Sequence, residues 1–178
     1  MGITNSNKQI DVTQIDCDGT LKVTLALSAA PDIAANPTDI VLVLDRSGSM
    51  AGSPLANMKV GANTFIDIID EATDGAQDGT IGSGSHIGIV SFANTATANT
   101  QLITSVETLK AAVDGLTAGG ATNHADAFTK AIELFDPNSS NEKVIVIFTD
   151  GKTTAGPPAA PIATAAKDSG IVIYCIGL

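Results

Sequence analysis

The chain has 178 residues, about the size of one ordinary domain, and its 44% hydrophobic content is typical of a globular protein and excludes a disordered or fibrous one. Its formal net charge is −10 and its nine lysines and arginines are spread thinly. We therefore expect no nucleic-acid partner, because affinity for a phosphate backbone depends on clustered basic residues.

No apolar run approaches the roughly 18 residues that a membrane-spanning helix needs, so we expect no membrane-spanning segment in this chain. No export signal is visible at the start of the sequence. Two cysteines, Cys17 and Cys175, lie near opposite ends. They are either two buried free thiols or one disulfide that joins the N-terminal segment to the last strand, and their spacing leaves both readings open.

The first predicted element is a strand over residues 20–27, where polar and apolar residues alternate. A connector with two prolines follows it. The uninterrupted Ile, Val and Leu run of residues 40–44 then predicts a strand buried on both faces in a parallel sheet. Beyond a Ser-Gly-Ser turn, Pro54 suits the first position of a helix, and apolar residues recur at helical spacing to about Ala72.

After a glycine-rich loop, residues 87–92 predict a second buried strand, and residues 96–104 predict an edge strand. Helices are expected over 105–116, with a serine as its cap, and over 124–135. Three elements complete the pattern: a buried strand over 144–148, a helix over 157–169 and a last strand over 171–176.

Buried apolar strands that alternate with amphipathic helices predict an α/β fold with a doubly wound, mainly parallel sheet and helices on both faces. We expect residues 1–38 to form an N-terminal extension and residues 39–178 to form the main domain. In such sheets, ligands bind beyond the carboxyl ends of the strands. Asp45 and Asp150 both lie at such ends, on two different strands.

Oxygen-bearing side chains from three separate stretches are expected to meet at this edge: Asp45, Ser47 and Ser49 after one strand, Thr122 before a helix, and Asp150 after another strand. This group offers no nitrogen or sulfur, so it suits a hard divalent cation and not zinc or copper. We expect Mg²⁺ first, with Mn²⁺ or Ca²⁺ as alternatives. The first three residues alone are equally compatible with a helix cap, and the two further stretches favour the metal site.

Three nearby residues have weaker claims to a role. Asp126 either supports the site from outside the ligand set or serves the positive N-terminus of its own helix, and we favour the second interpretation. We expect His124 to be an exposed or helix-start residue and His86 simply to precede a strand.

Three stretches, in this order, resemble the von Willebrand factor type A domain: DIVLVLDRSGSM at 39–50, GGATNHADAF at 119–128 and VIVIFTDG at 144–151. The five oxygen-bearing residues match that family's metal-ion-dependent adhesion site. The resemblance covers about residue 39 to the C-terminus and implies a final helix after the last strand, whereas the sequence ends at Leu178. The N-terminal stretch resembles the lead-in to such modules in bacterial surface proteins.

The resemblance also implies a role for each residue of the site. Ser47 and Ser49 bind the metal directly, and Thr122 binds it directly or through water. Asp45 and Asp150 act mostly through bridging waters. Because the direct protein ligands are largely neutral hydroxyls, the ion keeps much of its positive charge, and an Asp or Glu of a partner completes its octahedron.

The sequence argues against three kinds of catalytic site. The loop after Asp150 lacks the glycine that a phosphate-binding loop needs, because Val146 stands at that position. The serines lack the flanking glycines of a hydrolase nucleophile elbow. Ser47 stands where a phosphatase of similar topology needs a second aspartate, and no histidine or cysteine is paired with either serine to activate it. We therefore expect no enzyme.

The expected function is that of a metal-dependent adhesion module of a secreted or cell-surface protein, which binds a protein or matrix ligand through an Asp or Glu. The alternative is an intracellular scaffolding subunit of an ATPase- or chelatase-type assembly. The acidic charge, the two cysteines and the N-terminal lead-in favour the surface module.

Overall fold

The computed structural model describes residues 5–10, 23–28 and 36–178, and the chain divides into two compact units, Met1–Asp32 and Ile33–Leu178. The first unit contains an antiparallel pair, β1 (Asn5–Ile10) and β2 (Val23–Ser28). The strand predicted over 20–27 corresponds to β2. No strand was predicted at β1, because its sequence NSNKQI is polar and does not alternate.

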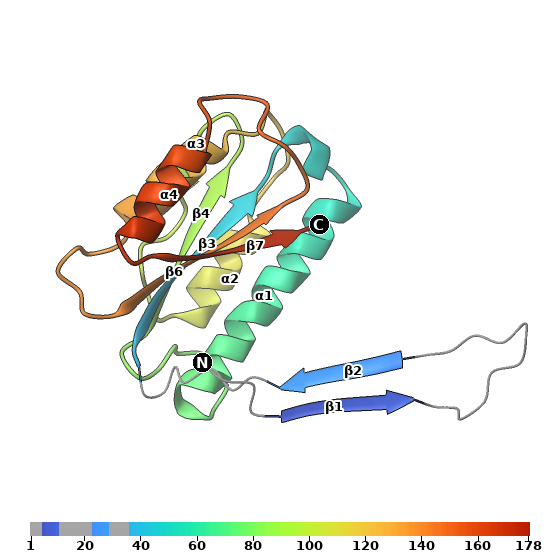
Figure 1. The fold of residues 1–178 in the computed structure, drawn as a ribbon, viewed down its shortest axis with the longest axis vertical. Helices are drawn as coiled ribbons and strands as arrows, with labels where there is room; N and C mark the ends of the chain where they lie inside the picture. Colours follow the sequence, from blue (N-terminus) through green and yellow to red (C-terminus); the bar gives the residue numbers. More distant parts are fainter. Residues whose placement is uncertain (1–4, 11–22, 29–35) are drawn as a thin grey trace, which may run out of the picture. The chain divides into compact units, whose positions relative to one another are not determined.

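The second unit is built on a five-stranded sheet with the order β5-β4-β3-β6-β7 (Figure 1). Its four parallel strands are β3 (Thr38–Asp45), β4 (His86–Phe92), β6 (Glu142–Thr149) and β7 (Val172–Gly177). The short β5 (Ala96–Ala98) pairs antiparallel with β4 at one edge. The prediction of a mainly parallel sheet is confirmed.

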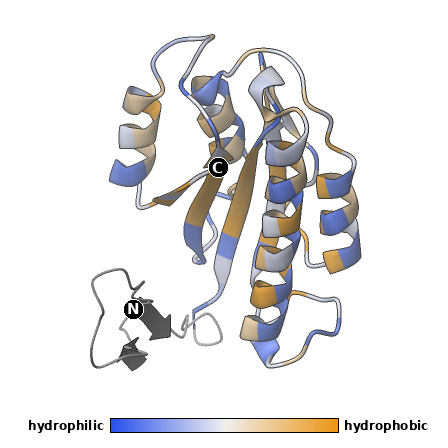
Figure 2. Cartoon of the chain, turned by 90° about the vertical axis from the view of Figure 1, so that its right-hand side faces the viewer, coloured by the Kyte–Doolittle hydropathy of each residue, from blue (hydrophilic) through white to orange (hydrophobic). Residues whose placement is uncertain are grey.

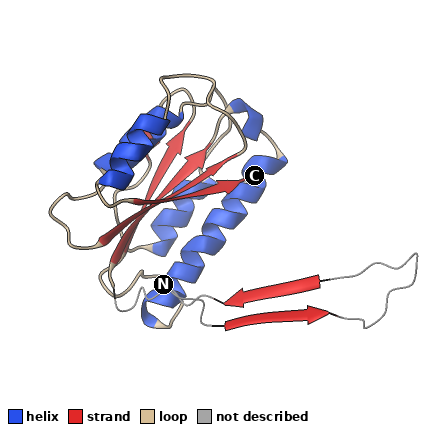
Figure 3. Cartoon of the chain, viewed as in Figure 1, coloured by secondary structure: helices blue, strands red, loops and turns tan. Residues whose placement is uncertain are grey.

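Four helices cover the two faces of this sheet (Figure 3). On one face lie α1 (Ser53–Asp74) and α2 (Val106–Asp114), and on the other lie α3 (His124–Glu133) and α4 (Ala160–Asp168). The doubly wound α/β fold is thereby confirmed. Helix α4 begins at Ala160, three residues later than predicted, with Pro161 rather than Pro157 in its first turn, where a proline is tolerated.

The central strand β3 is buried along all eight of its residues. Ile40, Leu42 and Leu44 pack with α1 and α2, whereas Val41 and Val43 pack with α3 and α4. Figure 2 shows strands of mainly hydrophobic residues between helices in which hydrophobic and hydrophilic residues alternate. A strand covered on both faces in this way holds its last residue in a fixed position.

The parallel register brings the carboxyl ends of neighbouring strands to one edge of the sheet. Asp45 lies opposite Phe92 of β4, and Leu44 lies opposite Phe148 of β6. The next residues on β3 and β6, Asp45 and Thr149, therefore end side by side. This edge is the one at which the sequence predicts the metal site.

Two further expectations concern the cysteines and the membrane. Cys175 is exposed on β7, so it is not a buried thiol, and Cys17 lies outside the described residues, so the disulfide alternative stays untested. Within the described ranges, none of the helices combines the length and the hydropathy required to cross a bilayer.

Candidate metal-binding site

Asp45 is a fully buried carboxylate at the end of β3. Its Oδ1 accepts a hydrogen bond from the backbone N–H of Ser47 at 2.8 Å, and its Oδ2 accepts one from the hydroxyl of Thr149 at 2.7 Å. Among the residues that the structure describes, no lysine or arginine pairs with it. A buried carboxylate held only by neutral donors suits a site that receives a cation.

Three further oxygen groups extend from Asp45 towards the surface. The Ser47 and Ser49 hydroxyl oxygens lie 3.2 Å apart, and the Ser49 hydroxyl donates to Asp150 Oδ1 at 3.0 Å. Ser47 is buried, Ser49 is exposed and Asp150 is partly exposed. The structure thus brings four of the five predicted residues into one hydrogen-bonded group that opens to solvent.

Thr122 lies in the neighbouring loop and is also buried. That loop is attached to the first one by the Gly48 N–H, which donates to the Gly120 carbonyl at 2.8 Å. The Thr122 N–H donates to the Thr154 hydroxyl at 2.8 Å, and its carbonyl accepts from the Thr154 N–H at 2.9 Å. In the described structure, the Thr122 hydroxyl makes no hydrogen bond with the other four predicted residues.

His124 begins α3, so it is the helix-start residue of the two alternatives, and it is buried rather than exposed. Its ring centroid lies 5.2 Å from that of Phe92. Its Nε2 lies 3.2 Å from the Thr149 hydroxyl oxygen and its Nδ1 2.9 Å from that of Thr153. The ring is buried because it fills the space between α3 and the ends of β4 and β6.

The hydrogen bonds around His124 define its protonation state. Burial lowers the pKa of His124, and the nearby Asp45 charge opposes this effect only in part. Because the Thr149 hydroxyl proton is donated to Asp45, the Nε2 of the neutral ring carries the proton and donates to Thr149, while Nδ1 accepts from Thr153. A chain of hydrogen bonds thus runs from an exposed loop to the buried carboxylate.

Thr149 and His124 are the residues around the site that the sequence reasoning missed. Thr149 is the last residue of β6 and directly precedes Asp150. This position at a strand end, beside a predicted site residue, is the signal in the sequence that could have identified it. A strand-end threonine is common, however, and its contact with Asp45 spans 104 positions of the sequence.

Asp126 takes part in the local structure of its helix. Its N–H donates to the Asn123 side-chain oxygen at 3.1 Å, and its carboxylate accepts from the Ala96 N–H at 2.6 Å. It lies in the first turn of α3, as the helix N-terminus interpretation requires, and it attaches that helix to β5.

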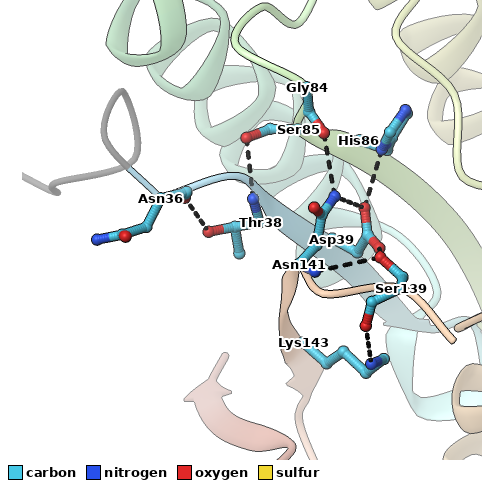
Figure 4. A network of polar contacts seen from close by, with 9 residues as sticks. All are labelled: Asn36, Thr38, Asp39, Gly84, Ser85, His86, Ser139, Asn141 and Lys143. Carbon is cyan, nitrogen blue, oxygen red and sulfur yellow. Dashed lines mark hydrogen bonds and ion pairs between the residues drawn. The ribbon is translucent and has the colours of Figure 1, made fainter. Parts of the chain in front are cut away.

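A second polar network lies at the opposite edge of the sheet, where the strands begin (Figure 4). Asp39 Oδ1 lies 2.9 Å from His86 Nδ1 and accepts a hydrogen bond from the Asn141 side-chain amide at 2.9 Å. Asp39 Oδ2 accepts a hydrogen bond from the Ser139 hydroxyl at 3.3 Å. His86 is the first residue of β4, so it begins that strand, and it also helps to anchor β3. This network joins two strand starts to the loop before β6.

The donor atoms decide which ion the candidate site fits. Over the described ranges of the chain, no three His, Cys, Asp or Glu side chains come together in a way that could hold a metal ion. The candidate site has two carboxylates, and its other groups are hydroxyls. Such an oxygen-only group fits a hard divalent cation.

Comparison with known proteins agrees with this architecture. The family model described as the von Willebrand factor type A domain matches residues 39–178. Human matrilin-3 is 31% identical over 156 residues, which cover 81% of this chain and 30% of matrilin-3. Bovine inter-alpha-trypsin inhibitor heavy chain H4 is 27% identical over 71% of this chain and 14% of its own length. The chain thus spans less than a third of these curated relatives.

Among solved structures, proximal thread matrix protein 1 from the mussel byssus, with a zinc-occupied adhesion-site motif, has a TM-score of 0.66 at 27% identity. That match covers 81% of this chain and 36% of the mussel chain. The five-stranded sheet with helices on both faces, the motif order and the family match over residues 39–178 agree with one another. This chain therefore belongs to the von Willebrand factor type A domain family.

Proposed function

We propose that this chain is a divalent-cation-dependent protein-binding module of a secreted or cell-surface protein. The observation that carries the proposal is the hydrogen-bonded oxygen group of Asp45, Ser47, Ser49 and Asp150 at the carboxyl edge of the sheet. Its deepest member is a buried carboxylate without a cationic partner among the described residues, and its outermost members reach solvent.

In this proposal, each residue of the site has a distinct role. Ser47 and Ser49 bind the ion through their hydroxyls, Thr122 binds it directly or through water, and Asp45 and Asp150 hold bridging waters. Neutral direct ligands leave the ion strongly electrophilic, so a carboxylate of a partner protein or matrix ligand completes the coordination. Metal and partner then bind together.

We propose Mg²⁺ as the ion, with Mn²⁺ and Ca²⁺ as alternatives, because all the side-chain donors are oxygen atoms. The mussel relative has zinc in its motif, so zinc belongs among the ions to be compared. We propose no catalytic role, because among the described residues neither serine is paired with a histidine or cysteine; Ser47 contacts Ser49, and Ser49 contacts Asp150.

A surface location is supported by the kinds of protein in which related domains occur. Matrilin-3 is one such relative, and a pilus tip protein of Porphyromonas gingivalis contains a domain of the same fold with a TM-score of 0.59. The second candidate, an intracellular scaffolding subunit, has the same fold, and no described contact favours it.

Thermal unfolding with and without metal tests the proposal. At a Mg²⁺ concentration 100 times its Kd, binding to the native state adds about 2.7 kcal/mol, which raises the Tm of a domain of this size by about 5–10 °C. We expect Asp45→Ala and Ser49→Ala to abolish this rise, and Asp136→Ala, which removes an exposed carboxylate at the opposite edge, to retain it. Identical melting curves for the wild type with chelator and with each metal would exclude the metal site.

A further inference from the structure

The loops that border the candidate site are poor in acidic residues, although the chain as a whole is acidic. Four connections form this edge: 46–52, 93–95, 115–123 and 150–159. Their charged residues are Arg46, Asp150 and Lys152, so the only acidic residue in these loops is one assigned to the metal site. Asp45 and Asp150 are both assigned to the metal site, so in a chain with a net charge of −10 the charged loop residues left to meet a partner at this edge are the basic Arg46 and Lys152.

Most lysines elsewhere in the described part of the chain already have polar partners. Their contacts are Lys59 with the Asp114 carbonyl at 2.7 Å, Lys110 with Asp67 at 2.5 Å, Lys130 with Glu133 at 2.6 Å and Lys143 with the Ser139 carbonyl at 3.0 Å. Over the same part of the chain, the side chains of Arg46 and Lys152 make no hydrogen bond or ion pair. Lys152 is exposed and Arg46 is partly exposed, so both are available to a partner.

The backbone holds both residues beside the site. The Arg46 N–H donates to the Phe92 carbonyl at 2.9 Å, and its own carbonyl accepts from the Gly119 N–H at 2.8 Å. Lys152 lies between Asp150, which contacts Ser49, and Thr153, which contacts His124. Both basic residues are therefore within two positions of proposed metal-site residues, in loops fixed by hydrogen bonds.

We propose that Arg46 and Lys152 form a second contact for a partner that presents an acidic surface. One carboxylate of the partner completes the coordination of the metal ion, and further Asp or Glu residues beside it contact these two side chains. The inference rests on the proposed function. At physiological salt the Debye length is about 8 Å, so the negative charge on distant parts of the chain is largely screened and the two nearby cations dominate the encounter. Complementary charge of this kind speeds association and selects among partners.

Two synthetic peptides of equal length test the proposal with the full chain in saturating Mg²⁺. One carries a single Glu among Gly and Ser, and the other carries the same Glu flanked by two Asp on each side. For the wild type, we expect the acidic peptide to bind at least tenfold more tightly than the single-Glu peptide. The double variant Arg46→Gln/Lys152→Gln should bind both about equally, whereas Lys167→Gln, in the last turn of α4, should behave as the wild type.

Direct Mg²⁺ titration separates the two proposals. The double variant should bind Mg²⁺ as tightly as the wild type or more tightly, because two positive charges have been removed near the ion. If Mg²⁺ binds but the double variant discriminates between the peptides as the wild type does, the second contact is wrong and the proposed function stands. If the wild type binds neither peptide, or binds both equally, the second contact is also wrong. Failure of the wild type to bind any divalent ion overturns the proposed function itself.

Discussion

At the residue scale, the position of Asp45 depends on a hydroxyl that is not among the five predicted site residues. Thr149 donates to Asp45 Oδ2 at 2.7 Å and is itself contacted by His124 at 3.2 Å. We expect Thr149→Val, which keeps the shape and removes the donor, to weaken Mg²⁺ binding about tenfold, as is typical when a residue that orients a ligand is lost. Thr149→Ser should restore most of the affinity. Titration calorimetry measures both, and equal affinities for the valine and serine variants would contradict the assignment.

A buried hydroxyl on β4 allows a second comparison between single residues. Ser91 is 1% exposed and its hydroxyl has no hydrogen-bond partner in the described structure, whereas the equally buried Ser85 accepts from the Thr38 N–H at 3.0 Å. We expect Ser91→Ala to leave the free energy of unfolding unchanged or to raise it, because it removes an unsatisfied polar group. Ser85→Ala should lower it by about 1–3 kcal/mol, because it leaves an N–H unpaired. Urea unfolding measures both; a larger loss for Ser91→Ala would reverse this assignment.

The site residues differ in how far the sequence could predict them. Asp45, Ser47 and Ser49 stand in one short motif after an apolar run, and a strand end is visible at Asp150, so their common edge followed from topology. The burial of His124 could not be predicted in the same way. It depends on Thr149 and Thr153, which lie 25 and 29 positions further along the chain and meet His124 only through the packing of α3 against β6.

At the scale of elements, β3 carries a buried carboxylate near each end, with different partners. Asp45 faces the candidate site, and Asp39 accepts hydrogen bonds from Ser139 and Asn141 and contacts His86. We expect Asp39→Ala to destabilise the fold by about 2–3 kcal/mol, because these partly buried donors lose a buried, charged acceptor. Mg²⁺ affinity should stay unchanged, since the network lies at the other end of the strand.

A nearby residue controls for this change. Asp136 is exposed, and among the described residues its carboxylate accepts only from Asn138. Asp136→Ala should cost less than about 1 kcal/mol, as exposed substitutions usually do. Chemical denaturation compares the two variants, and equal losses would show that the Asp39 network does not anchor β3.

Long elements with a strong period were predictable, and their ends were less so. The apolar run of β3 and the helical spacing of α1 predicted these elements to within two residues at either end. Helix α2 ends at Asp114, two residues before the predicted end, because the capping N–H of Gly115 completes the last turn. The extended form of β1 could not be predicted from its own composition, since it depends on pairing with β2.

At the scale of the whole molecule, the chain has 19 acidic and nine basic side chains, so the excess negative charges repel one another in the folded state. The three ion pairs in the described structure are short contacts between neighbouring groups, and screening weakens them less than it weakens the long-range repulsion. With chelator present, we therefore expect the Tm to rise as NaCl increases from about 10 mM to 150 mM, over which the Debye length falls from about 30 Å to about 8 Å. Scanning calorimetry measures this rise.

At equal ionic strength, MgCl₂ should raise the Tm of the wild type further and leave that of Asp45→Ala unchanged. Mg²⁺ binding at one site acts by mass action, whereas screening does not depend on Asp45. A Tm that stays flat or falls with NaCl would mean that local ion pairs outweigh the net charge.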